Sequence, residues 1–180
     1  MKRQKGFTLI ELMTTLGIGA VLVSMAVPGM QTVAMNSKQR SGVNDLISAM
    51  HLARNTAITT NARVTLCASS NGTACESVAW NDGWIVFADL DSDQTVDGNE
   101  VVLRSGTEAS GLDISSAQFS RFLMYRPSGR VMNASTATNV GEFTICDGRG
   151  TDHLRIVAID LSGRPRLTEY STLGLSPSCD

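Results

Sequence analysis

The hydrophobic and polar positions of the 180-residue chain divide it into an apolar N-terminal stretch and a longer mixed remainder. Residues 12–37 are 26 consecutive uncharged positions, and Glu11 precedes them directly. A helix needs about 20 apolar residues to cross a bilayer, so this stretch predicts a transmembrane helix. Basic residues before it predict a cytoplasmic N-terminus, with everything after Lys38 translocated.

An amphipathic helical pattern continues from the apolar stretch. Apolar residues recur at helical spacing, namely Val43, Leu46, Ile47, Met50, Ala57 and Ile58. A continuous helix over 7–60 would be about 80 Å long at 1.5 Å per residue. Pro28 would remove one hydrogen bond inside this helix, which predicts a kink.

From residue 61 the pattern changes to short alternating runs that are typical of β-strands. Seven are expected, at 63–67, 84–87, 100–104, 121–125, 142–146, 154–159 and 166–170. Gly, Asn, Asp and Ser separate them, as in antiparallel folds with tight turns. The expected fold class is therefore α+β, with one long N-terminal helix packed on a mostly antiparallel β head.

Two simple explanations of the N-terminal stretch leave Glu11 without a role. Ser24-Met25-Ala26 resembles the cleavage site of a secretory signal, but the apolar region is too long for one. A plain anchor of an envelope protein, outside any filament, would carry a costly carboxylate for no reason. That anchor remains an alternative.

The residues around Glu11 are more specific. Lys-Gly-Phe-Thr-Leu-Ile-Glu-Leu at positions 5–12 resembles the class III signal of type IV prepilins and type II secretion pseudopilins. The resemblance implies that prepilin peptidase cleaves between Gly6 and Phe7 and methylates the new amine of Phe7. It also implies that Glu11 pairs with the N-terminal amine of a neighbouring subunit, which relieves the cost of a carboxylate in hydrocarbon. Pro28 stands where such pilins carry a proline, and there the helix can unwind inside the filament.

The expected domains are a leader (1–6), a transmembrane helix segment (7–33), an amphipathic helix half (34–60) and a β-rich head (61–180). The resemblance implies a single-pass protein of the bacterial inner membrane with its head in the periplasm, or outside the cell if a pilus incorporates it. The implied partners are other pilins or pseudopilins, prepilin peptidase and membrane lipid. Pilus and secretion pseudopilus both stay open.

The head carries a less specific resemblance over most of the chain. A Trp-Asn-Asp-Gly-Trp-Ile-Val-Phe-Ala-Asp run, a later Ser-Gly-Arg turn and a C-terminal cysteine follow one another. This order resembles the GspH-like (H-type) pseudopilins and the FimT/FimU minor pilins. Trp80 and Trp84 are expected to pack in the core or at a sheet edge.

Four cysteines lie in the part of the chain that is expected to be translocated. An even number in that setting, without a CxxC pair, predicts disulfides rather than a metal site. Three pairings are possible. We favour Cys67–Cys75, which closes a short loop, and Cys146–Cys179, which ties the C-terminal tail to a strand; free buried thiols are the alternative.

Residues 89–100 resemble a twelve-residue calcium loop. Oxygen-bearing residues occupy its ligand positions, namely Asp89, Asp91, Asp93, Thr95, Asp97 and Glu100. Gln94 stands where such a loop needs glycine, and strands rather than helices flank it. Residues 76–113 hold nine acidic residues and one basic residue, so a cation would ease their repulsion. Calcium is thus the one candidate cofactor, and a solvated, metal-free loop is the alternative.

A turn at Gly163-Arg164-Pro165-Arg166 is a candidate DNA site. Two arginines held two positions apart could both reach phosphates, and this GRxR element is associated with DNA capture for natural transformation in FimT-type minor pilins. Arg149 and Arg155 are candidate helpers. A hairpin turn with solvated arginines is the alternative, because Ser-Gly-Arg turns also recur in members of the resembled family that serve assembly. The net charge of −2 would weaken long-range attraction to DNA and excludes a generally basic nucleic-acid protein.

No catalytic residues are expected. His51 and His153 are the two histidines, and neither belongs to an HExxH, GxSxG or P-loop pattern. The sequence therefore predicts a filament component rather than an enzyme.

Overall fold

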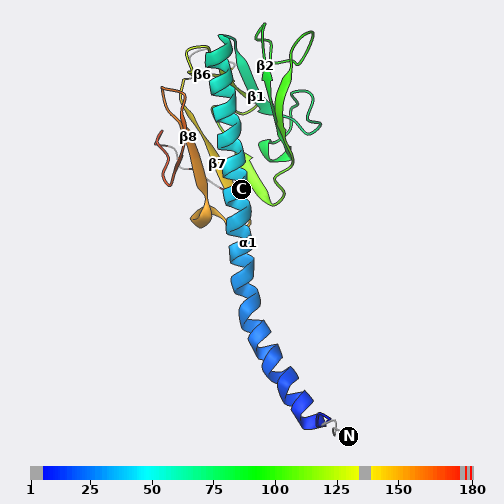
Figure 1. The fold of residues 1–180 in the computed structure, drawn as a ribbon. Helices are drawn as coiled ribbons and strands as arrows, with labels where there is room; N and C mark the ends of the chain where they lie inside the picture. Colours follow the sequence, from blue (N-terminus) through cyan, green and yellow to red (C-terminus); the bar gives the residue numbers. More distant parts are fainter. Residues whose placement is uncertain (1–5, 134–138, 175–176, 178, 180) are drawn as a thin grey trace. The chain divides into compact units, whose positions relative to one another are not determined.

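The computed structural model of the chain describes residues 6–133, 139–174, 177 and 179, except for the side chains of residues 26–28. The residues group into two units, 1–38 and 39–180. A single helix, α1 (Leu9–Thr60), contributes to both units (Figure 1).

Both ends of α1 have recognisable caps. The Thr8 hydroxyl accepts a hydrogen bond from the N–H of Glu11 at 3.3 Å. Threonine followed three residues later by glutamate is the sequence of a capping box, and a carboxylate in the first turn interacts favourably with the helix dipole. At the other end, Asn61 follows Thr60 in a left-handed conformation with φ of 53°, a common way for a helix to stop.

The strands of the second unit form two antiparallel sheets. Their bounds are β1 (Val64–Ala68), β2 (Trp84–Ala88), β3 (Val102–Gly106), β4 (Leu112–Ser115), β5 (Phe122–Tyr125), β6 (Val131–Met132), β7 (Gly141–Asp147), β8 (Arg155–Ile159) and β9 (Pro165–Thr168). One sheet has the order β3-β2-β1-β5-β6 and the other β4-β7-β8-β9. Two 3₁₀ helices, η1 (Trp80–Asp82) and η2 (Thr151–His153), interrupt the connections.

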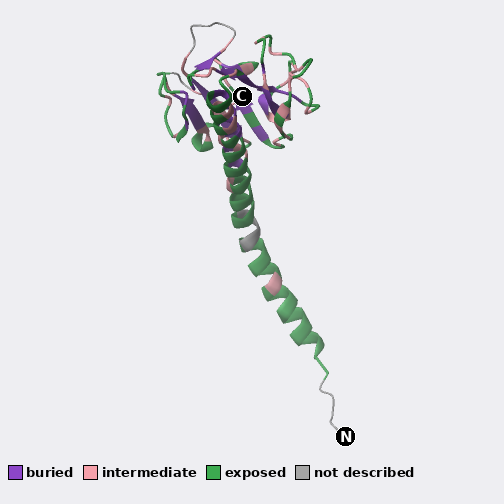
Figure 2. Ribbon diagram, turned by 45° about the horizontal axis from the view of Figure 1, so that its top comes forward, coloured by how far each residue is buried: buried purple, intermediate pink, exposed green. Residues whose placement is uncertain are grey.

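The C-terminal part of α1 packs on both sheets. In Figure 1 it runs between β1 and β2 on one side and β7 and β8 on the other. One helix face is buried, with Val43, Leu46, Ala49, Met50, Ala53 and Ala57. These side chains join apolar residues of both sheets in one core cluster, which is the buried interior of the head in Figure 2. Burial of such a face, more than helix propensity, stabilises a helix of this kind.

Aromatic residues fill the core where the sheets meet. The rings of Trp80 and Phe143 lie 5.1 Å apart, edge to face, and those of Phe119 and Phe143 lie 5.8 Å apart. The indole N–H of Trp80 donates to the carbonyl of Phe119 at 2.9 Å, so the buried polar atom has a partner. Trp80 and Trp84 are only 3% and 5% exposed, so both tryptophans of the chain report on the head.

The α+β fold with one long helix and antiparallel sheets is confirmed, and each of the seven expected strand segments overlaps an observed strand, with bounds that differ by up to two residues. Two strands were missed. β4 has only four residues, of which Leu112 and Ile114 are buried against the core. β6 has two residues and owes its conformation to pairing with β5. Ile58 belongs to the apolar pattern that predicted the packed face of the helix, but this placement was wrong, because its side chain is 42% exposed.

Both favoured disulfides are present. Cys67–Cys75 joins Cα atoms 5.6 Å apart, and Cys146–Cys179 joins Cα atoms 5.7 Å apart. A second contact holds the tail, because the buried carboxylate of Glu142 accepts hydrogen bonds from the hydroxyl of Ser171 at 2.5 Å and the N–H of Thr172 at 3.1 Å.

Candidate functional site

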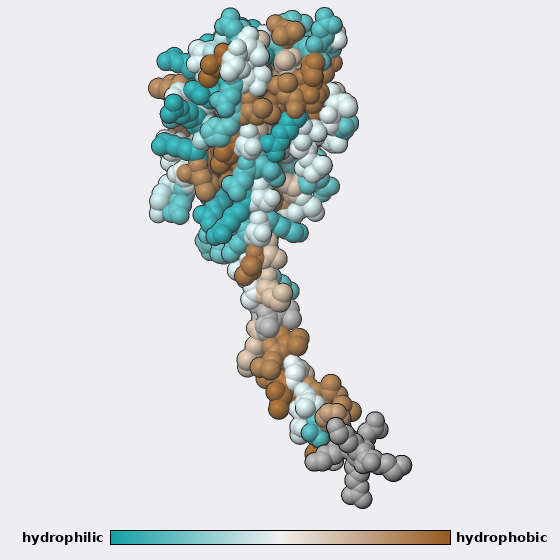
Figure 3. Space-filling view, viewed as in Figure 1, coloured by the Kyte–Doolittle hydropathy of each residue, from teal (hydrophilic) through white to brown (hydrophobic). Residues whose placement is uncertain are grey.

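The N-terminal unit presents an apolar helix surface. Gly6 and Phe7 precede α1, and Phe7 is 87% exposed. Large apolar side chains such as Leu9, Leu16 and Leu22 are exposed along the helix, which appears as brown atoms in Figure 3. By length and composition this stretch is apolar enough to cross a membrane. Exposure of so many apolar side chains indicates a surface that lipid or other helices cover.

Glu11 lies in the first turn of this exposed helix. Because its N–H is already bonded to Thr8, its backbone contributes to the helix start while its side chain stays exposed. Pro28 lies outside the residues whose side chains are described, so the kink expected there stays a prediction.

Two Ser-Gly-Arg turns meet in the head. The β5–β6 connection contains Ser128-Gly129-Arg130, and the β8–β9 connection contains Ser162-Gly163-Arg164. A Cβ atom built on Gly163 would lie 1.9 Å from the carbonyl oxygen of Gly129. The turns are therefore in direct backbone contact, although they belong to different sheets.

Arg54 of α1 joins the two turns. Its Nε donates to the carbonyl of Gly129 at 3.2 Å and to that of Ser162 at 3.3 Å, and its Nη2 also donates to Ser162 at 3.3 Å. One guanidinium thus holds both hairpin tips, a use that suits its fixed fork of donors.

Three further arginines surround this junction. Arg130, Arg164 and Arg166 are exposed, and none forms an ion pair with another described residue. Nearby, the Asp160 carboxylate accepts hydrogen bonds from the hydroxyl and N–H of Ser162 and from the N–H of Arg164. These bonds, of which the one from the hydroxyl has the largest effect, hold the pKa of Asp160 below its usual value. The two turns and these arginines, from Arg126 to Arg130 and Asp160 to Arg166, form what we call the hairpin junction.

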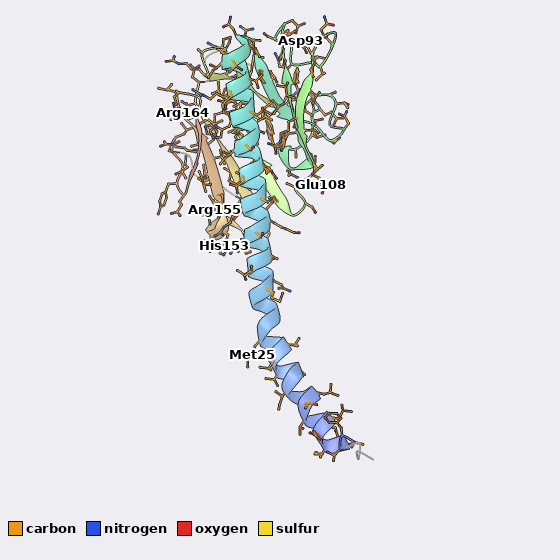
Figure 4. The ribbon with its side chains drawn as sticks, in the orientation of Figure 1. Met25, Asp93, Glu108, His153, Arg155 and Arg164 are labelled. Carbon is orange, nitrogen blue, oxygen red and sulfur yellow. A yellow bond between two sulfur atoms is a disulfide. The ribbon has the colours of Figure 1, made fainter. Side chains whose placement is uncertain are left out.

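The two candidate helpers do not belong to the hairpin junction. Arg149 donates to the carboxylate of Asp147, its neighbour two residues back. Arg155 begins β8, whereas Arg164 follows the end of that strand, and Figure 4 labels them at different heights of the head. His153 lies beside Arg155 in the same view.

The acidic loop brings three of its six expected ligand residues together. Carboxylate oxygens of Asp89, Asp91 and Asp93 lie within 4.8 Å of one another. Thr95 and Glu100 make other contacts: the N–H of Thr95 donates to Asp93 at 2.7 Å, and Glu100 accepts from the N–H of Leu90 at 2.6 Å. Asp97 is exposed and lies outside this carboxylate group.

Two protein-family models match the chain and show the family to which it belongs. Residues 42–163 match the family model of type II transport protein GspH, which covers more than half of the chain. The chain belongs to the GspH family. Residues 1–27 of this GspH-family chain also match the prokaryotic N-terminal methylation motif, which contains Gly6, Phe7 and Glu11.

Two crystal forms of a solved minor pilin support the fold of this GspH-family protein. The type IV minor pilin FimU of Pseudomonas aeruginosa, in one crystal form, aligns with a TM-score of 0.58 and 20% identity over 81% of this chain and 97% of FimU. A second crystal form of FimU gives a TM-score of 0.56 and 20% identity over 72% of this chain and 91% of FimU. The minor pseudopilin EpsH of Vibrio cholerae aligns with a TM-score of 0.45 and 13% identity over 73% of this chain and 96% of EpsH. No curated protein sequence matches the chain.

The GspH-family chain is thus a minor pilin or pseudopilin, a class of structural subunit that assembles into type IV pili or type II secretion pseudopili. Members assemble with other pilins or pseudopilins and are processed by prepilin peptidase. The apolar N-terminal helix and the motif indicate membrane anchoring with a soluble head.

Sequence reasoning missed two residues that organise the head. Arg54 is a charged residue of α1 that the apolar pattern does not include, yet it is half-buried at the hairpin junction. Gln39 is buried and donates to the carbonyl of His153 at 2.6 Å. Each borders the apolar stripe of α1, which was the available signal, but their acceptors lie more than 70 residues away.

Proposed function

We propose that the chain is a filament subunit of the bacterial inner membrane, cleaved between Gly6 and Phe7 and methylated on Phe7. One observation carries this proposal: an exposed apolar helix, with a single carboxylate in its first turn, follows a sequence that matches the methylation motif. After cleavage, the amine of Phe7 would lie four residues from Glu11, at the start of a helix that can pack beside its copies.

The proposed role of Glu11 is electrostatic pairing during assembly. A carboxylate in hydrocarbon is unfavourable unless an opposite charge accompanies it. In a bundle of processed subunits, the methylated ammonium group of a neighbouring Phe7 supplies that charge. The remaining surface of residues 9–25 would contact lipid before assembly and other pilin helices afterwards.

We place the head in the periplasm, or outside the cell when a pilus carries it. Two disulfides support an oxidising compartment, because such bonds are rare in the cytosol. Loss of the leader removes Lys2, Arg3 and Lys5, which leaves 12 basic against 17 acidic residues in the mature protein.

Mass spectrometry of the protein extracted from membranes tests this function. We expect a mature chain that begins at Phe7 and carries one additional methyl group. Gly6→Leu should leave the leader attached, because a small residue must precede the cleaved bond, whereas Ser24→Leu should be processed normally. An unprocessed wild-type N-terminus, or a chain that begins after Ala26, would contradict the proposal.

DNA binding is a second candidate function, and the hairpin junction favours it. Arg164 and Arg166 belong to an element that two hairpins and Arg54 hold in place, and Arg130 extends from the adjoining turn. Arginines on a fixed backbone lose less conformational entropy when they bind phosphate than arginines on a mobile loop. The two segments of the junction contain four arginines and one acidic residue, Asp160, which interacts with the charge of Arg166, so their net charge is positive.

A gel-shift titration of the full-length protein in detergent, at several salt concentrations, tests DNA binding. Arg164→Ala/Arg166→Ala should weaken duplex binding and reduce the slope of log affinity against log salt by about one per lost phosphate contact. Lys38→Ala/Arg40→Ala removes the same charge from two exposed positions of α1 and should bind nearly as the wild type does. Equal losses in both variants would indicate net charge alone, and no binding by the wild type would exclude this function.

A further inference from the structure

The loop after β2 begins with a buried carboxylate that lacks part of its hydrogen bonding. Asp89 follows Ala88 directly and is 0% exposed. Its Oδ2 accepts a hydrogen bond from the Thr65 hydroxyl at 2.6 Å. Its Oδ1 is also buried, and no described group bonds it with good hydrogen-bond geometry, although the backbone N–H groups of Ser92 and Gln94 lie near the carboxylate. Buried polar atoms almost always have a partner, so this oxygen indicates a missing ligand.

Two exposed carboxylates lie close to the carboxylate of Asp89. Asp91 and Asp93 each bring a carboxylate oxygen within 4.8 Å of one another and of Asp89. None of the three forms an ion pair with a described residue. Arg63, which reaches the same loop, donates to the hydroxyl of Ser92. Three carboxylates this close repel one another unless a cation lies between them.

The loop around this group is folded rather than extended. Ser92 and Gln94 both adopt left-handed conformations, with φ of 74° and 65°. Gln94 therefore makes the turn for which a calcium loop ordinarily uses glycine. Val96 packs against the buried cluster of Cys67, Ile85 and Phe87, and Glu100 closes the loop by accepting from the N–H of Leu90 at 2.6 Å.

We propose that Asp89, Asp91 and Asp93 bind a calcium ion. Carboxylate oxygens are hard ligands, and calcium accepts six to eight oxygens in irregular geometry, so water and backbone carbonyls can supply the remainder. Thr65 would hold the Asp89 carboxylate from behind, as second contacts of metal ligands commonly do. Burial raises the pKa of Asp89, and the hydrogen bonds from the Thr65 hydroxyl and from the backbone N–H groups of Ser92 and Gln94 oppose this rise.

Thermal unfolding of the full-length protein in detergent, followed by tryptophan fluorescence, tests the site. Calcium at 2 mM, compared with EDTA, should raise Tm by roughly 2–5 °C, as expected for a site of millimolar to submillimolar affinity. Asp91→Asn/Asp93→Asn should abolish this rise, and calorimetric titration should lose its saturable heat. Both residues are exposed, so the variant is expected to fold.

A matched variant separates a site from general charge. Glu108→Gln/Asp113→Asn removes two exposed acids of the same region and should keep the full calcium response. The proposal fails if wild-type Tm does not change, if both variants lose the response equally, or if magnesium at the same concentration gives the same rise. Neither filament assembly nor leader cleavage enters these measurements, so their outcome is separate from the proposed function.

Discussion

Two glycines set the geometry of the hairpin junction. Gly163 has φ of 73°, which costs an L residue about 1–2 kcal/mol, and it has no room for a side chain against Gly129. Gly111 has a similar φ of 79°, but nothing lies within 4 Å of the place its Cβ would take. A comparison of substitutions at Gly163 and Gly111 therefore separates the cost of backbone strain from the cost of steric overlap.

We expect Gly163→Ala to destabilise the head by about 3 kcal/mol or more, because strain and overlap add. Gly111→Ala should cost about 1 kcal/mol, from strain alone. Urea unfolding followed by tryptophan fluorescence measures both, since both tryptophans are buried in the head. Equal losses would show that the hairpins move apart at little cost.

Asp147, at the end of β7, makes stability depend on pH. The side chain of Arg149 bonds its carboxylate and holds the pKa of Asp147 below its usual value of 3.8. A lowered pKa in the folded state means that the contribution is present above about pH 4 and is lost as the pH falls through the folded-state pKa. The Asp147 side chain is 3% exposed, so water does little to replace Arg149.

Asp147→Asn should therefore lower Tm at pH 7, and its deficit against the wild type should shrink between about pH 4 and pH 2. Asp113→Asn, an exposed change on the neighbouring strand, should show a much smaller deficit at every pH. A deficit that stays constant down to low pH would mean that shape rather than charge makes the contact. Thermal scans from pH 2 to 8 give the comparison.

At the scale of elements, periodicity predicted what depends on local sequence. The alternating runs gave each longer strand, and the apolar stripe gave the buried face of α1. Short elements were missed because their conformation comes from a partner: β4 alternates over four residues, and β6 exists only beside β5. The sequence also could not show why position 42 is glycine. In the structure, a Cβ atom there would lie 2.6 Å from the side chain of Leu112 in β4.

The candidate sites divide in the same way. Local spacing identified the leader, the acidic loop and the GRxR turn, because each is a continuous segment. Local spacing could not show that Gly129 touches Gly163, because the two glycines lie in different hairpins. It also could not show that Arg54 bonds both turns, because its acceptors lie 75 and 108 positions further along the chain. It also grouped six calcium ligands where folding brings three together.

Gln39 provides a test of how α1 is fixed to the β4-β7-β8-β9 sheet. It is buried, and its amide donates to the carbonyls of His153 and Ile145 at 2.6 and 3.4 Å. Gln39→Leu leaves both acceptors without this donor and should cost about 2 kcal/mol. Asn44→Leu, at an exposed position of the same helix, should change stability by less than about 0.5 kcal/mol. Urea unfolding of the two variants distinguishes a buried polar anchor from simple apolar packing, for which Gln39→Leu would be neutral or stabilising.

At the scale of the whole molecule, folding and assembly rest on different units. The buried core, both disulfides and both tryptophans belong to residues 39–180. The methylation motif and the exposed apolar surface belong largely to residues 1–38. Changes near the N-terminus should therefore alter incorporation into a filament without altering unfolding of the head.

Glu11 is the residue at which this separation can be tested, because its structural and assembly roles respond differently to one substitution. As the third residue of α1, it can be replaced by glutamine, which keeps a side chain able to form hydrogen bonds at the helix start but loses the charge. If Glu11 acts only at the helix start, Glu11→Gln should assemble normally. If its charge pairs with the amine of a neighbouring subunit, Glu11→Gln should reduce co-purification with partner pilins by about tenfold or more, the loss expected when a buried ion pair loses one partner. Thr8→Ala removes the hydroxyl cap and keeps the charge, so the charge-pairing role requires that this variant still assemble. Tryptophan-monitored Tm should be unchanged in both variants; a lowered Tm would show instead that the N-terminal helix supports the head.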